Sequence, residues 1–400
     1  MEFQKTNLGE LSVNGKGSYG IAASAVPYSD ELFTYLRITD INDDGTLNKS
    51  GLMSVSDEKA EQYLLKPNDI VFARTGGSTG RSYFYDGTDG EFVYAGFLIK
   101  FSIDSTKVNP RFIKYYCLSQ EYRGWVHSFN TGSTRGNINA QTYANMPILL
   151  PSREQQDLLV DTLSVIDEKI KLNTAINENL EQQAQAIFKS WFVDFEPFGG
   201  AMPDDWAETT LGTIAAISTK SINPLKQPDL YLEHYSIPAY DEQHYPVFEY
   251  ASEVKSNKYI LTNNSVMISK LNPDTKRIWR PLCLSANPVC STEFIVYEAV
   301  NPKYKDYIYS LIDSQAFSDY LCAHTTGSTN SRQRATPKTT LDYTCIMPSD
   351  DIITRFCGIV TPMYDQIASN IIESQRLAAL RDTLLPKLMN GEIDVSAVKI

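Results

Sequence analysis

The stretch that decides the fold is Pro151–Trp191, which has the sequence PSREQQDLLVDTLSVIDEKIKLNTAINENLEQQAQAIFKSW. Ser152 stands three residues before Gln155, the spacing of a capping box, which satisfies two otherwise free backbone donors where a helix begins. Heptad positions then carry mostly apolar residues: Leu159, Leu163, Ile166, Ile170, Asn173, Asn177, Leu180, Ala184, Ile187 and Trp191. This a/d pattern predicts a long helix that packs against a partner helix.

The partner is predicted in the same chain, 197 residues further on, where the pattern recurs. Its positions are Phe356, Val360, Met363, Ile367, Asn370, Ser374, Leu377, Arg381, Leu384 and Leu388. Arg381, which matches Ala184, is the main exception to the apolar character. Because a buried Asn in such a pattern lowers stability but fixes register, we expect Asn173 and Asn370 to set the alignment of the two helices. About 35 residues at about 1.5 Å each would give a rod roughly 50 Å long.

Length and composition predict two or three folded domains in a soluble, cytoplasmic protein. The chain has 400 residues, of which 42% are hydrophobic. No apolar run approaches the length of a membrane span, and the first residues do not resemble a targeting segment. The six cysteines show no CxxC pair and no regular spacing, so we expect reduced thiols and neither a zinc site nor a disulfide framework.

The net charge of −12 argues against nucleic-acid binding until the positions of the bases are considered. The segment 270–280 contains four basic residues against Asp274 alone, and the segment 324–338 contains Arg332, Arg334 and Lys338 without an acid. Local basic patches can face phosphates even on an acidic protein. Ordinary solvated loops would give the same pattern, so charge alone leaves both interpretations open.

The chain contains an internal repeat. Strands are predicted at 35–41, 70–73 and 92–101, and a helix is predicted to start at Asn109-Pro110. The later segment repeats this order with strands at 266–268 and 294–297, followed by Asn301-Pro302. The tetrapeptide Thr-Gly-Ser-Thr occurs in both copies, at 131–134 and 326–329. The protein is therefore predicted to be two copies of one unit, each a mixed α/β domain followed by a long helix.

The predicted domain limits follow from this repeat. Residues 1–150 form the first α/β domain, 151–200 the first long helix, 201–348 the second α/β domain and 349–400 the second long helix. Pro386 is expected to stop or kink the second helix, because a proline ring removes a backbone donor and clashes with the preceding turn.

Common catalytic motifs are missing from the sequence. The four histidines form no HExxH motif, no GxGxxG follows a predicted strand, and the Asn-Pro pairs do not continue as the motif of an amino-methyltransferase. We therefore predict no catalytic residues and no metal site. One alternative remains: Asp241 with Glu253-Val254-Lys255 has the loose spacing of a metal-dependent nuclease.

Residues suited to DNA recognition gather in loops of both copies. Arg can bond a guanine edge and Asn an adenine edge, while Ser, Thr and glycine amides hold phosphates. The candidates are Arg74, Ser78, Arg81, Thr131, Ser133, Arg135 and Asn137 in the first copy, and Lys270, Asn272, Lys276, Arg277, Arg280, Ser328, Arg332 and Arg334 in the second. The Thr-Gly-Ser-Thr loops could equally be simple turns.

Several motifs resemble those of the specificity subunits of type I restriction-modification systems. They are Leu150–Gln156 (LPSREQQ), Ile187–Phe195 (IFKSWFVDF), Leu384–Ile393 (LLPKLMNGEI), Tyr35–Ile41 (YLRITDI) and Tyr19-Gly20-Ile21. The resemblance covers the whole chain. The second α/β domain departs most, since it shows no clear counterpart of the segment 37–40.

The resemblance implies an α+β fold: two α/β target recognition domains separated by two long helices that form an antiparallel coiled coil with internal pseudo-twofold symmetry. It implies that the chain is not an enzyme and reads a bipartite, asymmetric target in double-stranded DNA. The implied partners are two adenine methyltransferase subunits, which use S-adenosylmethionine and flip the target base, and a restriction endonuclease and translocase that uses ATP and Mg²⁺. This chain would bind no cofactor. A stand-alone metal-dependent nuclease and a coiled-coil scaffold without a DNA role remain the alternatives.

Overall fold

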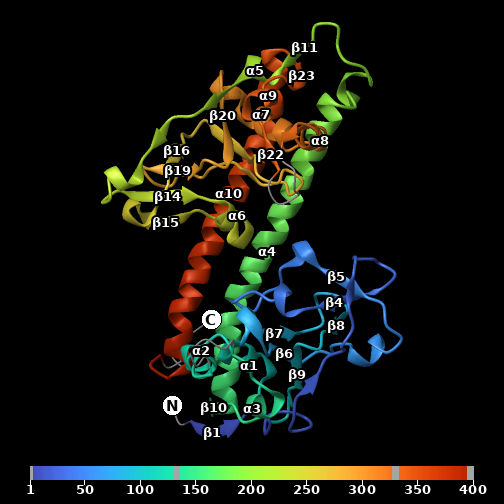
Figure 1. The fold of residues 1–400 in the computed structure, drawn as a ribbon, viewed down its shortest axis with the longest axis vertical. Helices are drawn as coiled ribbons and strands as arrows, with labels where there is room; N and C mark the ends of the chain where they lie inside the picture. The colour runs from blue at the N-terminus through green and yellow to red at the C-terminus, as the bar shows by residue number, and fades with distance from the viewer. Residues whose placement is uncertain (1–2, 130–135, 327–332, 394–400) are drawn as a thin grey trace. The chain divides into compact units, whose positions relative to one another are not determined.

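The computed structural model describes residues 3–129, 136–326 and 333–393, which belong to two compact units (Figure 1). Unit 1 comprises residues 1–170 and 376–400, and unit 2 comprises residues 171–375. Each unit therefore combines one α/β domain with parts of two long helices. The domain limits at residues 150, 200 and 348 stay a prediction.

Unit 1 is built on two four-stranded sheets, ordered β2-β9-β6-β7 and β3-β5-β4-β8, with β1 paired to β10. The strands are β1 Gln4–Asn7, β2 Ser18–Tyr19, β3 Ala25–Val26, β4 Phe33–Leu36, β5 Met53–Val55, β6 Asp69–Ala73, β7 Ser82–Tyr85, β8 Phe92–Tyr94, β9 Leu98–Ser102 and β10 Pro147–Leu150. The short helices are η1 Ile38–Asp40, η2 Lys49–Gly51, η3 Ala60–Tyr63, η4 Gly76–Ser78, α1 Pro110–Tyr116, α2 Gln120–His127 and α3 Ala140–Ala144.

Unit 2 repeats this plan, with sheets ordered β12-β20-β17-β18 and β13-β16-β19-β14-β15 and with β11 paired to β23. Its strands are β11 Ala207–Thr210, β12 Ala215–Ser218, β13 Ser221–Ile222, β14 Tyr231–Tyr235, β15 Val247–Tyr250, β16 Lys258–Ile260, β17 Ser265–Ser269, β18 Ile278–Trp279, β19 Pro288–Ser291, β20 Phe294–Ala299, β21 Thr325–Thr326, β22 Arg334–Ala335 and β23 Thr344–Met347. Its short helices are η5 Glu196–Phe198, α5 Leu211–Ile214, η6 Pro224–Lys226, α6 Ile237–Gln243, η7 Ala251–Glu253, η8 Pro302–Tyr304, α7 Lys305–Ile312, α8 Gln315–Ala323 and α9 Pro337–Thr340.

The two copies share the order of the first sheet and a parallel pair in the second, which extends the predicted repeat, although the second sheet has four strands in unit 1 and five in unit 2. In each unit the central strand, β6 or β17, lies between two antiparallel neighbours, β7 and β9 or β18 and β20. In the second sheet β4 runs parallel to β8 as β14 runs parallel to β19. Helix α6, which begins at Ile237 directly after β14, stands where η1 follows β4. The segment 37–40 therefore has a structural counterpart that its sequence does not show.

Two of the predicted strands are shorter than expected. The strand expected over 35–41 ends at Leu36, because Asp40 folds back and accepts hydrogen bonds from the Arg37 backbone N at 2.8 Å and Arg37 Nε at 2.9 Å, which closes helix η1. The strand expected over 92–101 is two strands, β8 and β9, in different sheets. A turn between them is closed by the Leu98 N–H on the Ala95 carbonyl.

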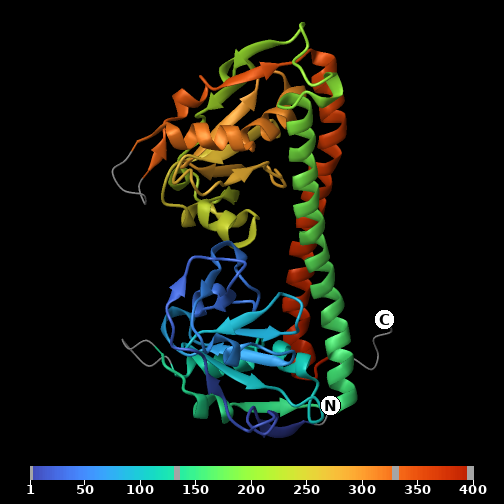
Figure 2. The same ribbon diagram turned by 90° about the vertical axis from the view of Figure 1, so that its right-hand side faces the viewer.

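The predicted long helices are α4 Arg153–Phe192 and α10 Asp350–Met389 (Figure 2). The predicted helix start is confirmed, since the Gln155 N–H donates to Ser152 Oγ at 3.4 Å. None of the predicted heptad positions is exposed. In unit 1, Leu159 and Leu163 share a core with Leu385 and Leu388, and in unit 2, Phe188 packs on Phe356. The two helices run antiparallel within each unit, because a later residue of α4 contacts an earlier one of α10.

The predicted asparagines form a pair of related contacts in unit 2. Asn173 Nδ2 donates to Ser374 Oγ at 3.1 Å, and Asn370 Nδ2 donates to Asn177 Oδ1 at 2.8 Å. Because Asn173 matches Asn370 and Asn177 matches Ser374 in the repeat, the two hydrogen bonds occupy equivalent places. Asn173 is fully buried and Asn370 is 5% exposed. We call these four residues the polar lock.

The structure explains the polar Arg381 in the apolar pattern of α10 and shows how the helix accommodates Pro386. Arg381, the exception in the heptad pattern, is held in unit 1 by Asp167 at 3.1 Å, and Lys114 contacts the same carboxylate at 2.7 Å. The helix does not stop at Pro386 but continues to Met389. The carbonyl that the proline leaves without a partner is that of Asp382, an exposed residue, so water can satisfy it. The left-handed Gly391 follows the helix end.

Candidate nucleic-acid interface

In unit 1 three of the predicted DNA-binding residues come together at the end of β6. Arg74 follows that strand directly, and Ser78 is the last residue of the short helix η4, which begins at Gly76. The returning segment joins them, because the Ile138 N–H donates to the Arg74 carbonyl at 2.9 Å and Asn137 forms a β-bridge with Thr75. Thr79 Oγ1 also donates to the Gly136 carbonyl at 3.0 Å. Backbone pairing thus brings Arg74, Ser78 and Asn137 together where the central strand β6 ends. We call this end of the sheet the β6 edge.

Arg74 is held in place by an aromatic ring rather than by a carboxylate. Its guanidinium carbon lies 5.0 Å from the centre of the Tyr19 ring, a cation–π contact. Tyr19 is fixed in turn, since β2 pairs with β9 and the Tyr19 hydroxyl accepts a hydrogen bond from the Ala140 N–H at 3.2 Å. The Arg74 Nε is buried and has no hydrogen-bond partner among the described residues. The hydrogen-bonding capacity of this donor is therefore unused within the described residues.

Arg81, the fourth described candidate in unit 1, is turned toward another loop. Its Nε donates to Asp43 Oδ1 at 2.7 Å and its Nη1 to the Ile41 carbonyl at 3.0 Å. These contacts anchor the turn Asn42–Gly45, which the Gly45 N–H closes on the Asn42 carbonyl.

Unit 2 assembles an equivalent edge at the end of β17. The Lys270 N–H donates to the Glu293 carbonyl at 2.9 Å, and the Lys270 carbonyl accepts from the Ala335 N–H at 2.9 Å. The Asn272 N–H donates to the Gln333 carbonyl at 3.0 Å, and Leu271 forms a β-bridge with Arg334. Lys270, Asn272 and Arg334 therefore lie together. Asn272 adopts a left-handed conformation with φ 48°, and its Oδ1 is buried without a described partner.

An ion pair organises the exposed part of this edge. Arg334 Nε lies 3.0 Å from Glu293 Oε2, and Nη2 lies 3.4 Å from Oε1. The hydrogen bond to Glu293 raises the pKa of the Arg334 guanidinium above its ordinary value. The Arg334 side chain is 45% exposed, so the pair restrains Arg334 without covering it.

Lys276 and Arg277, from the densest basic segment, both pair with carboxylates. Lys276 Nζ lies 2.5 Å from Asp313 Oδ1, which belongs to a carboxylate that also accepts from Gln185 Nε2. Arg277 donates from Nε and Nη2 to the two oxygens of Asp241, at 2.6 and 2.9 Å. Their charges are thus largely balanced within unit 2.

Arg280 has a structural role that the sequence did not indicate. It donates to both oxygens of Asp306, at 2.7 and 3.2 Å, and to Asp365 at 2.9 Å, which ties the end of β18 to α7 and α10. The side chains of Arg280 and Asp306 are only 16% and 6% exposed. Burial opposes the charge of each group, but their mutual hydrogen bonds outweigh it, raising the pKa of Arg280 and lowering that of Asp306.

The remaining predicted DNA-binding residues lie outside the described part of the chain. They are Thr131, Ser133, Arg135, Ser328 and Arg332. Their roles stay predictions.

Three neighbours of Arg74 and Lys270 were missed by sequence reasoning. Tyr19 and Phe97 lie beside Arg74, the latter through the hydrogen bond from the Arg74 N–H to the Phe97 carbonyl at 3.1 Å, and both are exposed, by 42% and 60%. Glu293 takes the place of Phe97 in unit 2. The repeat itself carried the signal, because Phe97 follows Arg74 at the same interval as Glu293 follows Lys270.

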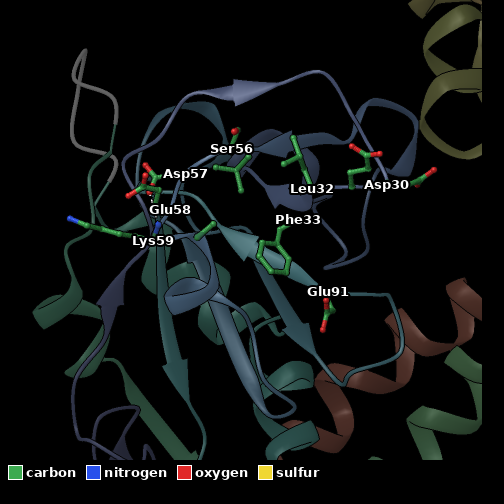
Figure 3. Close-up of a pocket in the computed structure, with 11 residues that line it drawn as sticks. Asp30, Leu32, Phe33, Ser56, Asp57, Glu58, Lys59 and Glu91 are labelled. Atoms are coloured by element: carbon green, nitrogen blue, oxygen red, sulfur yellow. Dashed lines mark hydrogen bonds between the residues drawn. The ribbon is translucent and has the colours of Figure 1, made fainter.

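One hollow in unit 1 lies elsewhere and has the wrong charge for DNA. It has a volume of about 790 Å³ and carries five carboxylates against one lysine: Asp30, Glu31, Asp57, Glu58 and Glu91, with Lys59 (Figure 3). Asp57, Glu58 and Lys59 stand on one side of Phe33, and Asp30 on the other. Phosphate groups would be repelled here, so we place the candidate interface at the β6 and β17 edges.

The nuclease alternative finds no support in these contacts. Asp241 is bound by Arg277, and among the described residues no three His, Cys, Asp or Glu side chains lie close enough together to hold a metal ion. In the same residues no helix is long and apolar enough to cross a membrane.

A duplicated α/β domain that presents basic and amide side chains at the end of the central strand in each copy has the donors and acceptors that contacts to DNA require. Comparison with known proteins narrows the possibilities. Residues 6–182 match the family model of the type I restriction modification DNA specificity domain.

Relatives of this chain carry the same description. It is 25% identical over 406 aligned residues to the type I restriction enzyme HindI specificity subunit of Haemophilus influenzae, covering 82% of this chain and 87% of that protein. The MjaIX specificity subunit of Methanocaldococcus jannaschii is also 25% identical, over 72% of this chain and 70% of its own length. The crystal structure of the type I restriction-modification S subunit from M. genitalium shares the fold, with a TM-score of 0.54 at 16% identity over 97% of this chain and 96% of that one.

Residues 6–182 therefore match a DNA specificity domain, and over most of its length the chain is similar to specificity subunits of type I restriction enzymes. These similarities support DNA sequence recognition as the role of this chain.

Proposed function

We propose that the chain reads a bipartite, asymmetric target in double-stranded DNA, one half with each α/β domain. The observation that carries this proposal is the pair of equivalent edges at β6 and β17, which have the same backbone path but different side chains. Arg74, Ser78 and Asn137 face one half of the target, and Lys270, Asn272 and Arg334 face the other. Since the two sets differ, the two half-sites differ in sequence.

The chemistry belongs to partner subunits in this proposal. Two adenine methyltransferase subunits supply the S-adenosylmethionine site and flip the target adenine, and a restriction subunit uses ATP and Mg²⁺ in the cytoplasm. The chain itself directs these partners to the DNA and binds no cofactor. Support comes from the relatives named above, which are described as type I restriction enzyme specificity subunits.

The first test is chain-dependent methylation. Cells that express the chain with its neighbouring methyltransferase subunit are expected to carry N6-methyladenine at a split, asymmetric motif, and cells lacking only this chain are expected to lose it. Long-read sequencing of genomic DNA provides the measurement. An identical methylation pattern in both strains, with the methyltransferase shown to be present and folded, contradicts the proposed function and favours the scaffold alternative.

A second prediction concerns the spacing of the half-sites, which we assign to the register of α4 and α10. Replacing the two asparagines that match in the repeat, N173L with N370L, should remove both hydrogen bonds of the polar lock and leave the helices free to shift by a heptad. We expect methylated motifs with more than one spacing, or a mixed population in native mass spectrometry. The exposed Asn179 on α4 provides the matched control, N179L. A double variant with one spacing and one species would argue against this role.

A further inference from the structure

We infer that Arg74 and Lys270 each read a base of one half-site, and that Phe97 and Glu293 determine which base pairs the neighbouring position accepts. This inference rests on the proposed function and deepens it, because it names specificity-determining residues. It includes three side chains, Tyr19, Phe97 and Glu293, that were not among the predicted DNA-binding residues.

The first argument is positional equivalence. Arg74 and Lys270 each follow the central strand of their sheet, and the N–H of each donates to the carbonyl of the turn residue, Phe97 or Glu293, at 3.1 and 2.9 Å. The carbonyl of each accepts from the returning segment, Ile138 or Ala335, at 2.9 Å. The backbone of each basic residue is therefore hydrogen-bonded on both sides. A backbone fixed in this way is rigid enough to place the side chain against a base edge.

The second argument is the availability of these two side chains. The other described basic candidates, Arg81, Lys276, Arg277, Arg280 and Arg334, all pair with carboxylates. Arg74 and Lys270 form no ion pair with any described residue, and the Arg74 Nε has no partner at all among them. A guanidinium that is oriented by the Tyr19 ring and not bound by a carboxylate has the paired donors that suit the two acceptors, O6 and N7, of guanine.

The third argument is how the two edges differ. Phe97 is 60% exposed and apolar, which suits contact with the methyl group of thymine. Glu293 at the equivalent position is 30% exposed, accepts from Arg334, and has the oxygen acceptors that cytosine N4 requires. The two edges therefore offer different chemistry at the same place, as an asymmetric target requires.

The test uses the full-length chain with its methyltransferase partner and reads the methylated motif by sequencing. R74Q replaces a guanidinium, which suits the O6 and N7 acceptors of guanine, with an amide, which suits N6 and N7 of adenine. K270Q removes the positive charge of Lys270 in the same way. We expect R74Q to change or relax the motif in one half-site and K270Q in the other half-site only. On DNA substrates, discrimination against a single base-pair change in the affected half should fall by about tenfold or more. F97S and E293Q should relax a base pair next to the one affected in the same half.

Matched controls are R111Q in unit 1, at a 45% exposed arginine, and K303Q in unit 2, at an exposed lysine; both should leave the motif unchanged. Thermal unfolding and assembly with the methyltransferase show whether each variant is folded. If R74Q does not fold, R74K replaces it, because R74K keeps the charge but loses the fork geometry of the guanidinium and should also relax the motif.

A motif unchanged in R74Q and K270Q, or a uniform loss of methylation without a change of motif, overturns this inference while the chain-dependent methylation of the wild type still supports the proposed function. Changes in both half-sites from one substitution overturn it as well.

Discussion

Replacing Arg280 with alanine is expected to destabilise unit 2 by about 3–5 kcal/mol, because it leaves Asp306 buried without its partner. Asp306 is 5% exposed and depends on Arg280 and on Thr361 Oγ1, at 2.6 Å, for its hydrogen bonds. Urea unfolding of the full-length chain provides the measurement. R277A is the matched control: its partner Asp241 is 44% exposed and can be solvated, so the loss should be about 1 kcal/mol or less.

The same ion pair predicts a dependence on pH. The folded-state pKa of Asp306 is lowered, so its contribution to stability is fully present above the unfolded-state pKa of about 3.9 and is lost as the pH falls below that value. R280A should therefore lose less stability on acidification than the wild type does. Equally small losses of unfolding free energy in R280A and R277A would refute the structural role of Arg280.

In that case, a fall in methylation by a variant lacking both arginines would have to be attributed to lost DNA contacts rather than to unfolding.

The second large effect is expected at Phe356, where F356A should cost about 3–5 kcal/mol. Phe356 is fully buried in unit 2, and its ring lies 5.0 Å from that of Phe192, 6.0 Å from those of Phe188 and Trp191, and 6.2 Å from that of Tyr307. The truncation would therefore open a cavity where α4, α7 and α10 meet, and edge-to-face ring contacts would be lost with it.

Ile359 on the same helix is the control for this prediction. It is 40% exposed, so I359A should change the free energy of unfolding by no more than about 0.5 kcal/mol. The two variants differ in burial and not in the helix they alter. Similar unfolding curves for F356A and I359A would mean that the aromatic cluster does not hold unit 2 together.

Local and periodic signals predicted much of this fold. The heptads of α4 and α10 were visible because helix packing repeats every seven residues, and every predicted seam position is buried or half-buried. Asn109 caps α1 as its place before Pro110 indicated. The repeat was visible because both copies keep the Asn-Pro pair and the Thr-Gly-Ser-Thr tetrapeptide. The counterpart of η1 in unit 2 is helix α6, whose sequence is too different to be recognised.

The candidate interface was predictable only in part, because ion pairing depends on contacts distant in sequence. Lys276, Arg277 and Arg280 form a basic cluster along the chain, but their carboxylates come from other elements: Asp313, Asp241, and Asp306 with Asp365. Counting charges in a window cannot reveal such partners. Tyr19 was not recognised as a neighbour of Arg74 for the same reason, since only the sheet brings β2, which pairs with β9, close to the residue that follows β6.

The polar lock has a consequence for how such a protein can change over generations. Its two hydrogen bonds are equivalent and separate, so one mutation at Asn173 leaves the bond between Asn370 and Asn177 in place. Tolerance of one mutation protects the register of the helices, while the side chains at the ends of β6 and β17 take no part in that pairing. Under the proposed function, a point substitution at one of these ends changes the sequence preference of one copy and leaves the spacing and the other copy unchanged.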